Sequence, residues 1–194
     1  MTTLIENNSL KNDVLESSVR TILAEIGEDP NREGLVDTPK RVAKMYREVF
    51  SNVGVNPETA LTTTFAEEYD GIITVKDITF YTFCEHHLIP FFGKAHIGYI
   101  PDGRIVGLSK FARLTELVAG RPQVQERMSQ QIATAIMNVL EPQGVIVTVE
   151  ATHLCMCARG VKKPGTSTVT TVKMGVFAQN VALCEEFERA ISRN

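Results

Sequence analysis

The sequence predicts an α+β fold in which a four-stranded antiparallel sheet carries a pair of helices on one face, behind an N-terminal helical appendage. Three observations lead to this prediction. The N-terminal quarter repeats apolar side chains at helical spacing, the later part contains runs of β-branched and aromatic residues, and two further helical segments separate the second run from the third. The main part is therefore expected to have the order ββααββ, followed by a short last helix.

The N-terminal appendage is predicted to contain two helices. In residues 13–26 the apolar side chains recur every three or four positions, whereas the preceding residues are polar and are predicted to be frayed. The dipeptide Thr38-Pro39 offers an N-cap hydroxyl followed by proline at the first helical position, which predicts a second helix. We assign residues 1–60 to the appendage and residues 61–194 to the main, catalytic domain.

The main domain alternates between strand and helix patterns. Ser109 is predicted to cap one helix and Pro122 to open a longer one that stops before Pro142. The stretch 166–171 is rich in hydroxyl and β-branched residues without a blocking proline, so this edge of the sheet is expected to continue into a neighbouring subunit. The strands are predicted at residues 71–81, 94–100, 145–153 and 167–177.

Composition and charge narrow the function classes. A net charge of -3 argues against nucleic-acid binding by bulk electrostatics, so any anionic ligand must be held by a local basic cluster. No run of apolar residues is long enough for a membrane span, and the N-terminus does not resemble a signal peptide, which predicts a cytoplasmic protein with reduced thiols. The candidate basic residues are Lys110, Arg113, Arg121 and Arg127, and Arg159, Lys162 and Lys163.

Histidine and cysteine are concentrated in two short windows, Cys84-Glu85-His86-His87 and His153-Leu154-Cys155-Met156-Cys157. Imidazole and thiolate are donors that zinc selects, so we expect folding to bring the windows together around one metal ion. The spacing of Cys84 and His87 requires a turn, while an extended third strand would place His153 and Cys155 on the same face.

Two kinds of zinc site are compatible with these donors. A closed structural site would use four of them, for instance Cys84, His87, Cys155 and Cys157. A catalytic site would use three and keep a position for water, which leaves His86 and His153 beside that position as proton carriers near neutral pH. The remaining His96 and Cys184 are interpreted as structural residues.

Five motifs together resemble the zinc-dependent GTP cyclohydrolase I family over most of the chain, from about residue 15 to the C-terminus. They are Gly34-Leu-x-x-Thr-Pro-x-Arg-Val-Ala-x-Met-Tyr46, Thr79-x-Tyr-x-x-Cys-Glu-His-His-Leu88, Gly107-Leu-Ser-Lys-Phe-Ala-Arg113, Arg121-Pro-Gln-Val-Gln-Glu-Arg127 and His153-x-Cys155-Met-x-x-Arg159-Gly160. The resemblance implies the tunnelling fold, a homodecamer with active sites between subunits, and hydrolytic opening of the guanine ring of GTP at C8. Formate would be released and 7,8-dihydroneopterin triphosphate formed, the first step of tetrahydrofolate and pterin biosynthesis.

The resemblance also implies roles for individual residues. Zn²⁺ would be held by three of them, and two histidines would move protons. Glu126, with Gln125 beside it, would read the guanine edge, and Ser109 would lie near the ribose. The metal ligands would be Cys84, His87 and Cys155, the proton carriers His86 and His153, and the triphosphate ligands Lys110, Arg113 and Arg159.

Cys157 departs from the family pattern, because it is a thiol two residues beyond the expected ligand. It could compete for zinc or form a disulfide, and we interpret it as a bystander. Two alternatives stand beside the hydrolase. One is the sibling nitrile reductase of the same fold, which the histidine-rich motifs disfavour; the other is a non-catalytic, zinc-stapled oligomeric module that binds nucleotide.

Overall fold

The computed structural model describes residues 3–192, with side chains from residue 14 onward. The chain divides into two compact units, Met1–Ser51 and Asn52–Asn194. Each unit is described separately below. Among the described residues, no helix is both long enough and apolar enough to cross a membrane.

The first unit is a pair of helices, α1 (Thr3–Glu25) and α2 (Thr38–Val49). The two helices pack against each other, with Val19 of α1 and Ala43 of α2 buried. The backbone of α1 is helical from Thr3, so the prediction of a frayed chain is wrong for residues 3–12, while residues 1 and 2 lie outside the described residues. Pro39 lies in the first turn of α2 as predicted, but Asp37 rather than Thr38 is the N-cap residue.

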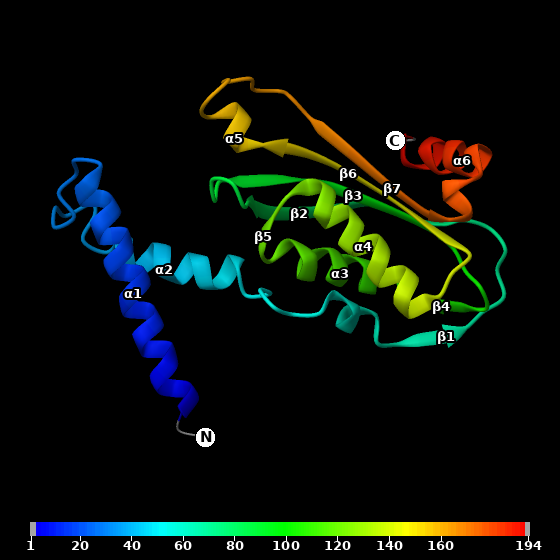
Figure 1. Cartoon of the computed structure of the whole chain (residues 1–194), viewed down its shortest axis with the longest axis horizontal. Coiled ribbons are helices and arrows are strands. Elements are labelled where there is room, and N and C mark those ends of the chain that lie inside the picture. Colours follow the sequence, from blue (N-terminus) through cyan, green and yellow to red (C-terminus); the bar gives the residue numbers. More distant parts are fainter. Residues whose placement is uncertain (1–2, 193–194) are drawn as a thin grey trace. The chain divides into compact units, whose positions relative to one another are not determined.

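The second unit is built on a five-stranded sheet with the order β5-β2-β3-β6-β7 (Figure 1). Four long strands pair in antiparallel fashion, as predicted: β2 with β3, β3 with β6, and β6 with β7. The predicted count of four is wrong, because β5 adds a short parallel strand beside β2. The strands are β2 (Ile73–Cys84), β3 (Pro90–Ile100), β5 (Pro122–Gln123), β6 (Gly144–His153) and β7 (Thr168–Gly175).

Helices α3 (Ser109–Ala119) and α4 (Gln125–Leu140) cover one face of the sheet. Their apolar sides meet the inward side chains of β3 and β6 in the main core, which includes Phe111, Ile132 and Val147, all fully buried. Leaving aside the short elements, the order of this unit is β2, β3, α3, α4, β6, β7, which is the predicted ββααββ order. Helix α6 (Val181–Ser192) forms a second, smaller core on the other face.

Two predicted helix starts are wrong. Ser109 is the first residue of α3, and the N-cap is Leu108, which makes no side-chain capping bond. Pro122 does not open the long helix, because it pairs with Phe83 of β2, and α4 begins only at Gln125.

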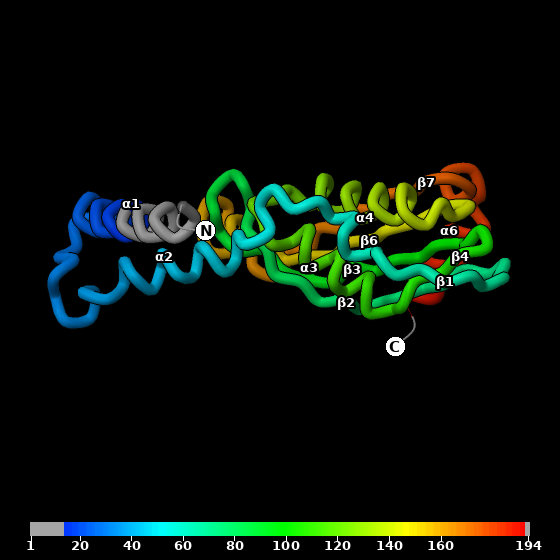
Figure 2. The backbone as a smooth tube through the Cα atoms, turned by 90° about the horizontal axis from the view of Figure 1, so that it is seen from below, coloured from blue at the N-terminus to red at the C-terminus, as the bar shows by residue number. Residues whose placement is uncertain are grey.

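Several short elements were not predicted. The 3-10 helix η1 (Pro57–Leu61) leads to strand β1 (Thr64–Ala66), which pairs with β4 (Arg104–Val106) in a separate two-stranded sheet. Figure 2 shows β1 and β4 side by side at one end of this unit.

The remaining histidine and cysteine are structural, as predicted. Asp77 lies in a bulge of β2 with a φ of 60°, and its backbone N–H donates to Nδ1 of the buried His96 at 3.2 Å. Burial lowers the pKa of His96, although the Asp77 carboxylate acts in the opposite direction. The buried thiol of Cys184 donates to the carbonyl of Phe177 at 3.2 Å and belongs to the second core.

Candidate metal and nucleotide site

The first half of the metal cluster lies in a tight turn at the end of β2. The N–H of Leu88 donates to the carbonyl of Cys84 at 2.8 Å, and the N–H of Cys84 donates to the carbonyl of Ile89 at 3.0 Å. Leu88 takes a positive φ of 50° to close this turn. The predicted turn is therefore present, and it brings His87 back beside Cys84. Residues 84–89 are called the metal turn below.

The second half of the cluster lies where β6 ends. The strand stops at His153, and a single helical turn, α5 (Leu154–Cys157), follows directly. The expectation that His153 and Cys155 share one face of an extended strand is therefore wrong. The helical turn instead directs the Cys155 thiol toward Cys84 and His87, because the ligand atoms of these three residues lie within 4.8 Å of one another.

Cys84, His87 and Cys155 could hold a metal ion. In a tetrahedral zinc site the bonds are about 2.0 to 2.3 Å long, so ligand atoms stand about 3.3 to 3.8 Å apart. The observed spacing allows that geometry after small side-chain movements. Burial and the neighbouring Cys84 raise the pKa of Cys155, a crowding of two thiols that a cation would relieve. Cys157 is outside this group, and its thiol lies 3.6 Å from the carbonyl of Lys163.

His153 is held rigidly beside the cluster. Its ring stacks on Phe91 with centroids 4.4 Å apart and planes at 10°, and its Nε2 lies 2.8 Å from Oε1 of Gln125. Burial lowers the pKa of His153, although the nearby Glu126 carboxylate acts in the opposite direction. His86 is more exposed, and its Nδ1 lies 3.4 Å from the Cys84 sulfur.

The hydrogen bonds of Gln125 decide which nitrogen of His153 carries a proton. The Gln125 amide nitrogen donates to the carbonyls of Val149 and Thr168, both at 2.9 Å, which orients the amide oxygen toward the ring. An amide oxygen only accepts, so Nε2 of His153 must donate. In the neutral ring, Nδ1 is then the nitrogen that is free to accept a proton.

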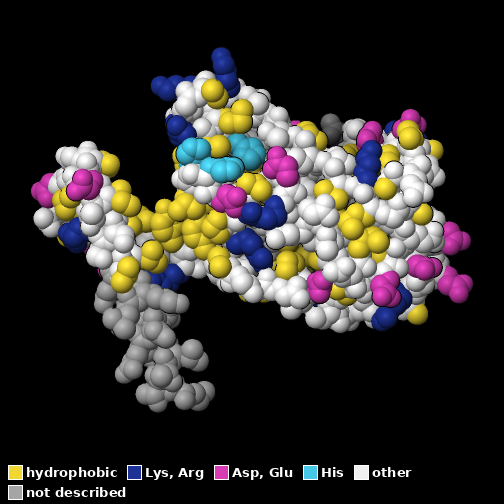
Figure 3. Space-filling view, viewed as in Figure 1, with side chains coloured by type: hydrophobic (Ala, Val, Ile, Leu, Met, Phe, Trp, Pro, Cys, Tyr) yellow, Lys and Arg dark blue, Asp and Glu magenta, His cyan; other side chains and the backbone are white. Residues whose placement is uncertain are grey.

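A cavity of about 200 Å³ lies beside the cluster. Figure 3 shows histidine side chains gathered in one patch on this face, next to acidic and basic side chains. Gln125 is buried in the cavity wall with its amide occupied, whereas the neighbouring Glu126 is exposed. The predicted site residues among the lining are Cys84, His86, Gln125, Glu126, His153 and Cys155.

The predicted phosphate and ribose residues are divided between two places. Arg159 is beside the cluster, with Nη1 at 2.6 Å from Nε2 of His87. Ser109, Lys110 and Arg113 do not line the cavity, because they lie on the first turns of α3. The last turn of α3 lies beside the end of β2, where the Thr82 hydroxyl donates to the carbonyl of Ala119 at 2.7 Å. At 1.5 Å per residue, the three side chains begin about 9 to 15 Å further along the axis.

Comparison with known proteins identifies the family. The profile described as GTP cyclohydrolase I matches residues 15–192. The chain belongs to the GTP cyclohydrolase I family. It is 60% identical over 164 residues to the GTP cyclohydrolase 1 of Geobacillus kaustophilus (strain HTA426), which covers 84% of this chain and 87% of that protein. It is 54% identical over 180 residues to the GTP cyclohydrolase 1 of Bacillus subtilis (strain 168), covering 92% and 95% respectively.

A distant structural likeness was also found. The crystal structure of the archaeosine synthase QueF-Like in the apo form aligns with a TM-score of 0.45 and 15% identity, over 56% of this chain and 97% of that one. This likeness is too weak to support a conclusion about the present GTP cyclohydrolase I family member.

In this GTP cyclohydrolase I family member an ion pair lies behind the metal turn, and it could not be predicted from the sequence. Arg127 of α4 donates to the carboxylate of Glu85, and this contact lowers the pKa of Glu85. Arg121, another residue of the predicted basic cluster, donates to the carbonyls of Val55 and Leu117 at 2.8 and 3.1 Å. Both residues belong to one sequence motif, but only the folded register reveals their partners.

Proposed function

We propose that the protein is a cytoplasmic GTP cyclohydrolase I, which opens the guanine ring of GTP at C8, releases formate and forms 7,8-dihydroneopterin triphosphate. The observation that carries this proposal is the three-donor cluster of Cys84, His87 and Cys155, two of which line a cavity together with His86, His153 and Glu126. Membership of the family and the names of the close relatives support the same reaction.

The metal in this proposal is zinc, held by Cys84, His87 and Cys155. Two thiols and one imidazole form a donor set typical of zinc, and three protein ligands leave the open position that catalytic sites require. When bound, zinc supplies a Lewis acid that makes water nucleophilic near neutral pH. Arg159 must release Nε2 of His87 if that atom becomes the ligand.

His153 is proposed as the main proton carrier, acting at Nδ1. Its Nε2 proton is committed to Gln125, so proton exchange with the substrate takes place at the other nitrogen. Protonated at Nδ1, the ring donates to N7 of guanine, which makes C8 more susceptible to attack by water. His86 supports the water or the later ribose steps from the other side of Cys84.

Glu126 is proposed to recognise guanine. Its exposed carboxylate lines the cavity and can accept hydrogen bonds from N1–H and the exocyclic amine together, which adenine cannot offer. Gln125 lines the same cavity, but its amide is bonded to Val149, Thr168 and His153. Gln125 therefore acts through His153 as a positioning residue.

The nucleotide site is proposed to be completed by a second subunit. Arg159 can bind the triphosphate from the same chain as the metal, whereas Ser109, Lys110 and Arg113 of that chain do not line its cavity. These residues would serve the cavity of a neighbouring copy. The exposed edge strand β7 offers a surface for joining the sheets of neighbours, in agreement with the homodecamer that the family resemblance implies.

The experiment is incubation of the purified protein with GTP, with formate measured directly and the neopterin product measured by fluorescence after oxidation. Metal stripping should abolish both signals, and added zinc should restore them. If the zinc-loaded protein binds GTP but releases no formate, the proposed reaction is wrong, and the protein is better described as a non-catalytic, zinc-stapled module that binds nucleotide.

A further inference from the structure

Two chain segments meet behind the metal cluster. One is the turn that begins at Cys84, and the other is the connection between α3 and α4. Cys84 pairs with Gln123 in the short parallel ladder, and the N–H of Glu85 donates to the carbonyl of Gln123 at 3.0 Å. The base of the metal turn is thus attached to the segment that leads into Gln125 and Glu126.

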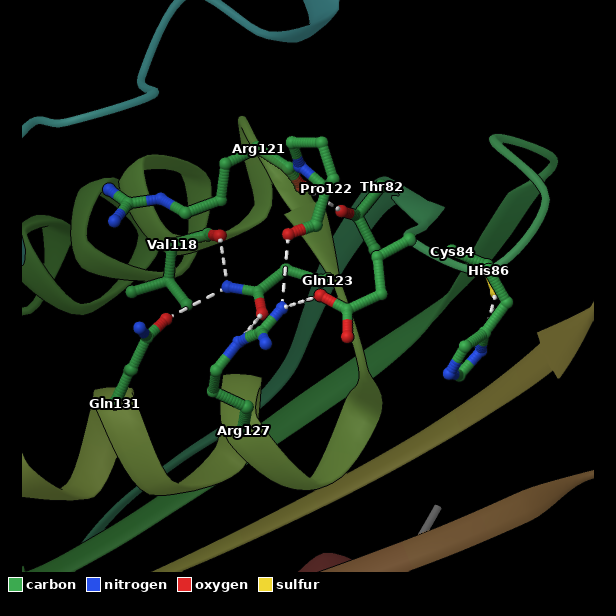
Figure 4. A network of polar contacts seen from close by, with 10 residues as sticks. Thr82, Cys84, His86, Val118, Arg121, Pro122, Gln123, Arg127 and Gln131 are labelled. Atoms are coloured by element: carbon green, nitrogen blue, oxygen red, sulfur yellow. Dashed lines mark hydrogen bonds and ion pairs between the residues drawn. The ribbon is translucent and has the colours of Figure 1, made fainter.

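Arg127 connects the same two segments through its side chain (Figure 4). Its guanidinium donates to the carboxylate of Glu85, to Oε1 of Gln123 at 3.1 Å and to the carbonyl of Pro122 at 3.2 Å. A planar guanidinium has donors in fixed directions and can hold three acceptors at once, which a lysine ammonium would not do with the same geometry. The position of Glu85 is therefore fixed relative to α4.

Gln123 anchors this arrangement in the protein interior. Its side chain is fully buried, and its amide nitrogen donates to the carbonyl of Val118 at 2.9 Å and to Oε1 of Gln131 at 2.8 Å. These bonds orient the amide oxygen of Gln123 toward Arg127. The contact to Glu85 is therefore supported by both helices that cover the sheet.

We propose that Arg127 is a positioning residue for the metal site, which holds Cys84 and His87 at a fixed place relative to Gln125 and Glu126 by binding Glu85. This inference deepens the proposed function and depends on it. From the sequence Arg127 was a candidate for binding an anionic ligand, but its charge is already balanced by Glu85 and its Nε and Nη2 groups are already bonded. Its effect on the reaction is therefore exerted through the metal turn.

The test is the affinity for zinc of the full-length chain without GTP, measured by competition with a chromophoric chelator. Removing an interaction behind a metal ligand typically weakens metal binding about 10- to 100-fold. We expect Arg127→Met and Glu85→Gln each to weaken zinc binding by about 10-fold or more, and the double variant to be little worse than either single one. Arg127→Lys should recover only part of the loss.

Arg189→Met is the matched control, because it removes an exposed arginine that pairs with Glu185 at 3.8 Å on α6. It should leave zinc affinity and turnover as in the unmodified protein. Thermal unfolding of every variant separates a local effect from a loss of folding. If Arg127→Met does not fold, Glu85→Gln, which preserves the size of the side chain, decides the matter by the same measurement.

The inference is overturned if Arg127→Met binds zinc as tightly as the unmodified protein and only raises KM for GTP, which is the result expected of a phosphate ligand. Unchanged zinc affinity in Glu85→Gln would overturn it as well. Failure of the proposed function looks different, because the unmodified protein would then release no formate from GTP with zinc bound.

Discussion

Replacing Gln125 by alanine tests the assignment of this side chain to His153 rather than to guanine. The variant loses the bond to His153 at 2.8 Å and the two bonds to the carbonyls of Val149 and Thr168 at 2.9 Å. Each such bond contributes about 1 kcal/mol, so the free energy of unfolding should fall by about 3 kcal/mol.

The same substitution should affect turnover more than substrate binding. Without its partner, His153 loses the bond that fixes its tautomer and orientation, and correctly placed acid–base catalysis is worth about 10²- to 10⁴-fold. We expect kcat for GTP to fall about 10- to 100-fold while KM changes by less than about 3-fold. Steady-state kinetics of formate release and denaturant unfolding measure the two effects.

Gln130→Ala is the control, because Gln130 is an exposed glutamine on the same helix whose amide donates to Thr134 at 3.1 Å. Its kcat should be close to that of the unmodified protein. An unchanged kcat in Gln125→Ala, combined with a raised KM and weaker preference for GTP over ATP, would refute the reasoning. Gln125 would then contact guanine directly, as the family resemblance implies.

Three further predictions concern single side chains. His153→Ala should keep zinc and GTP binding but lose turnover by about 10² or more, and turnover at the unmodified rate would remove its role as proton carrier. Glu126→Ala should lose discrimination between GTP and ATP in competition assays, whereas unchanged selectivity would contradict the guanine contact. Because burial lowers the pKa of His96, the unfolded chain takes up a proton more readily than the folded one as the pH falls through the ordinary value of about 6.5. The melting temperature should therefore decrease between pH 7.5 and 5.5, and less so in His96→Asn; an equal decrease in both proteins would show that another group is responsible.

The long elements of the catalytic unit could be predicted because each has a repeated local pattern. Strands such as β6 show continuous β-branched residues, and α4 shows an apolar side over several turns. Pro122 misled the prediction because proline suits both the first turn of a helix and the edge of a sheet. The choice depends on pairing with Phe83, 39 positions earlier in the chain, which no local pattern reveals. Strands β1 and β4 have only three residues each, too few for a period to be recognised.

The same distinction between local patterns and tertiary contacts applies to the candidate site. The metal donors could be recognised because histidine and cysteine are rare and concentrated in two windows. The partners of Gln125 and Arg127 could not, because glutamine and arginine on a helix are usually exposed and acquire a specific role only through tertiary contacts. The family resemblance implied a place for Gln125 beside guanine, and the sequence put Arg127 in a basic cluster. Their contacts with His153 and Glu85 are visible only in the fold.

The stacking of His153 on Phe91 restricts how this imidazole can work. The two rings are nearly parallel and their centroids are 4.4 Å apart. One face of the imidazole is therefore covered, and rotation of the imidazole out of the ring plane is hindered. The face stacked on Phe91 is closed to a substrate, and the contact with Gln125 holds the Nε2 edge of the ring in place. For the proton carrier proposed above, successive intermediates would have to move past a stationary nitrogen, and rearrangement of the ligand would set the order in which protons are exchanged.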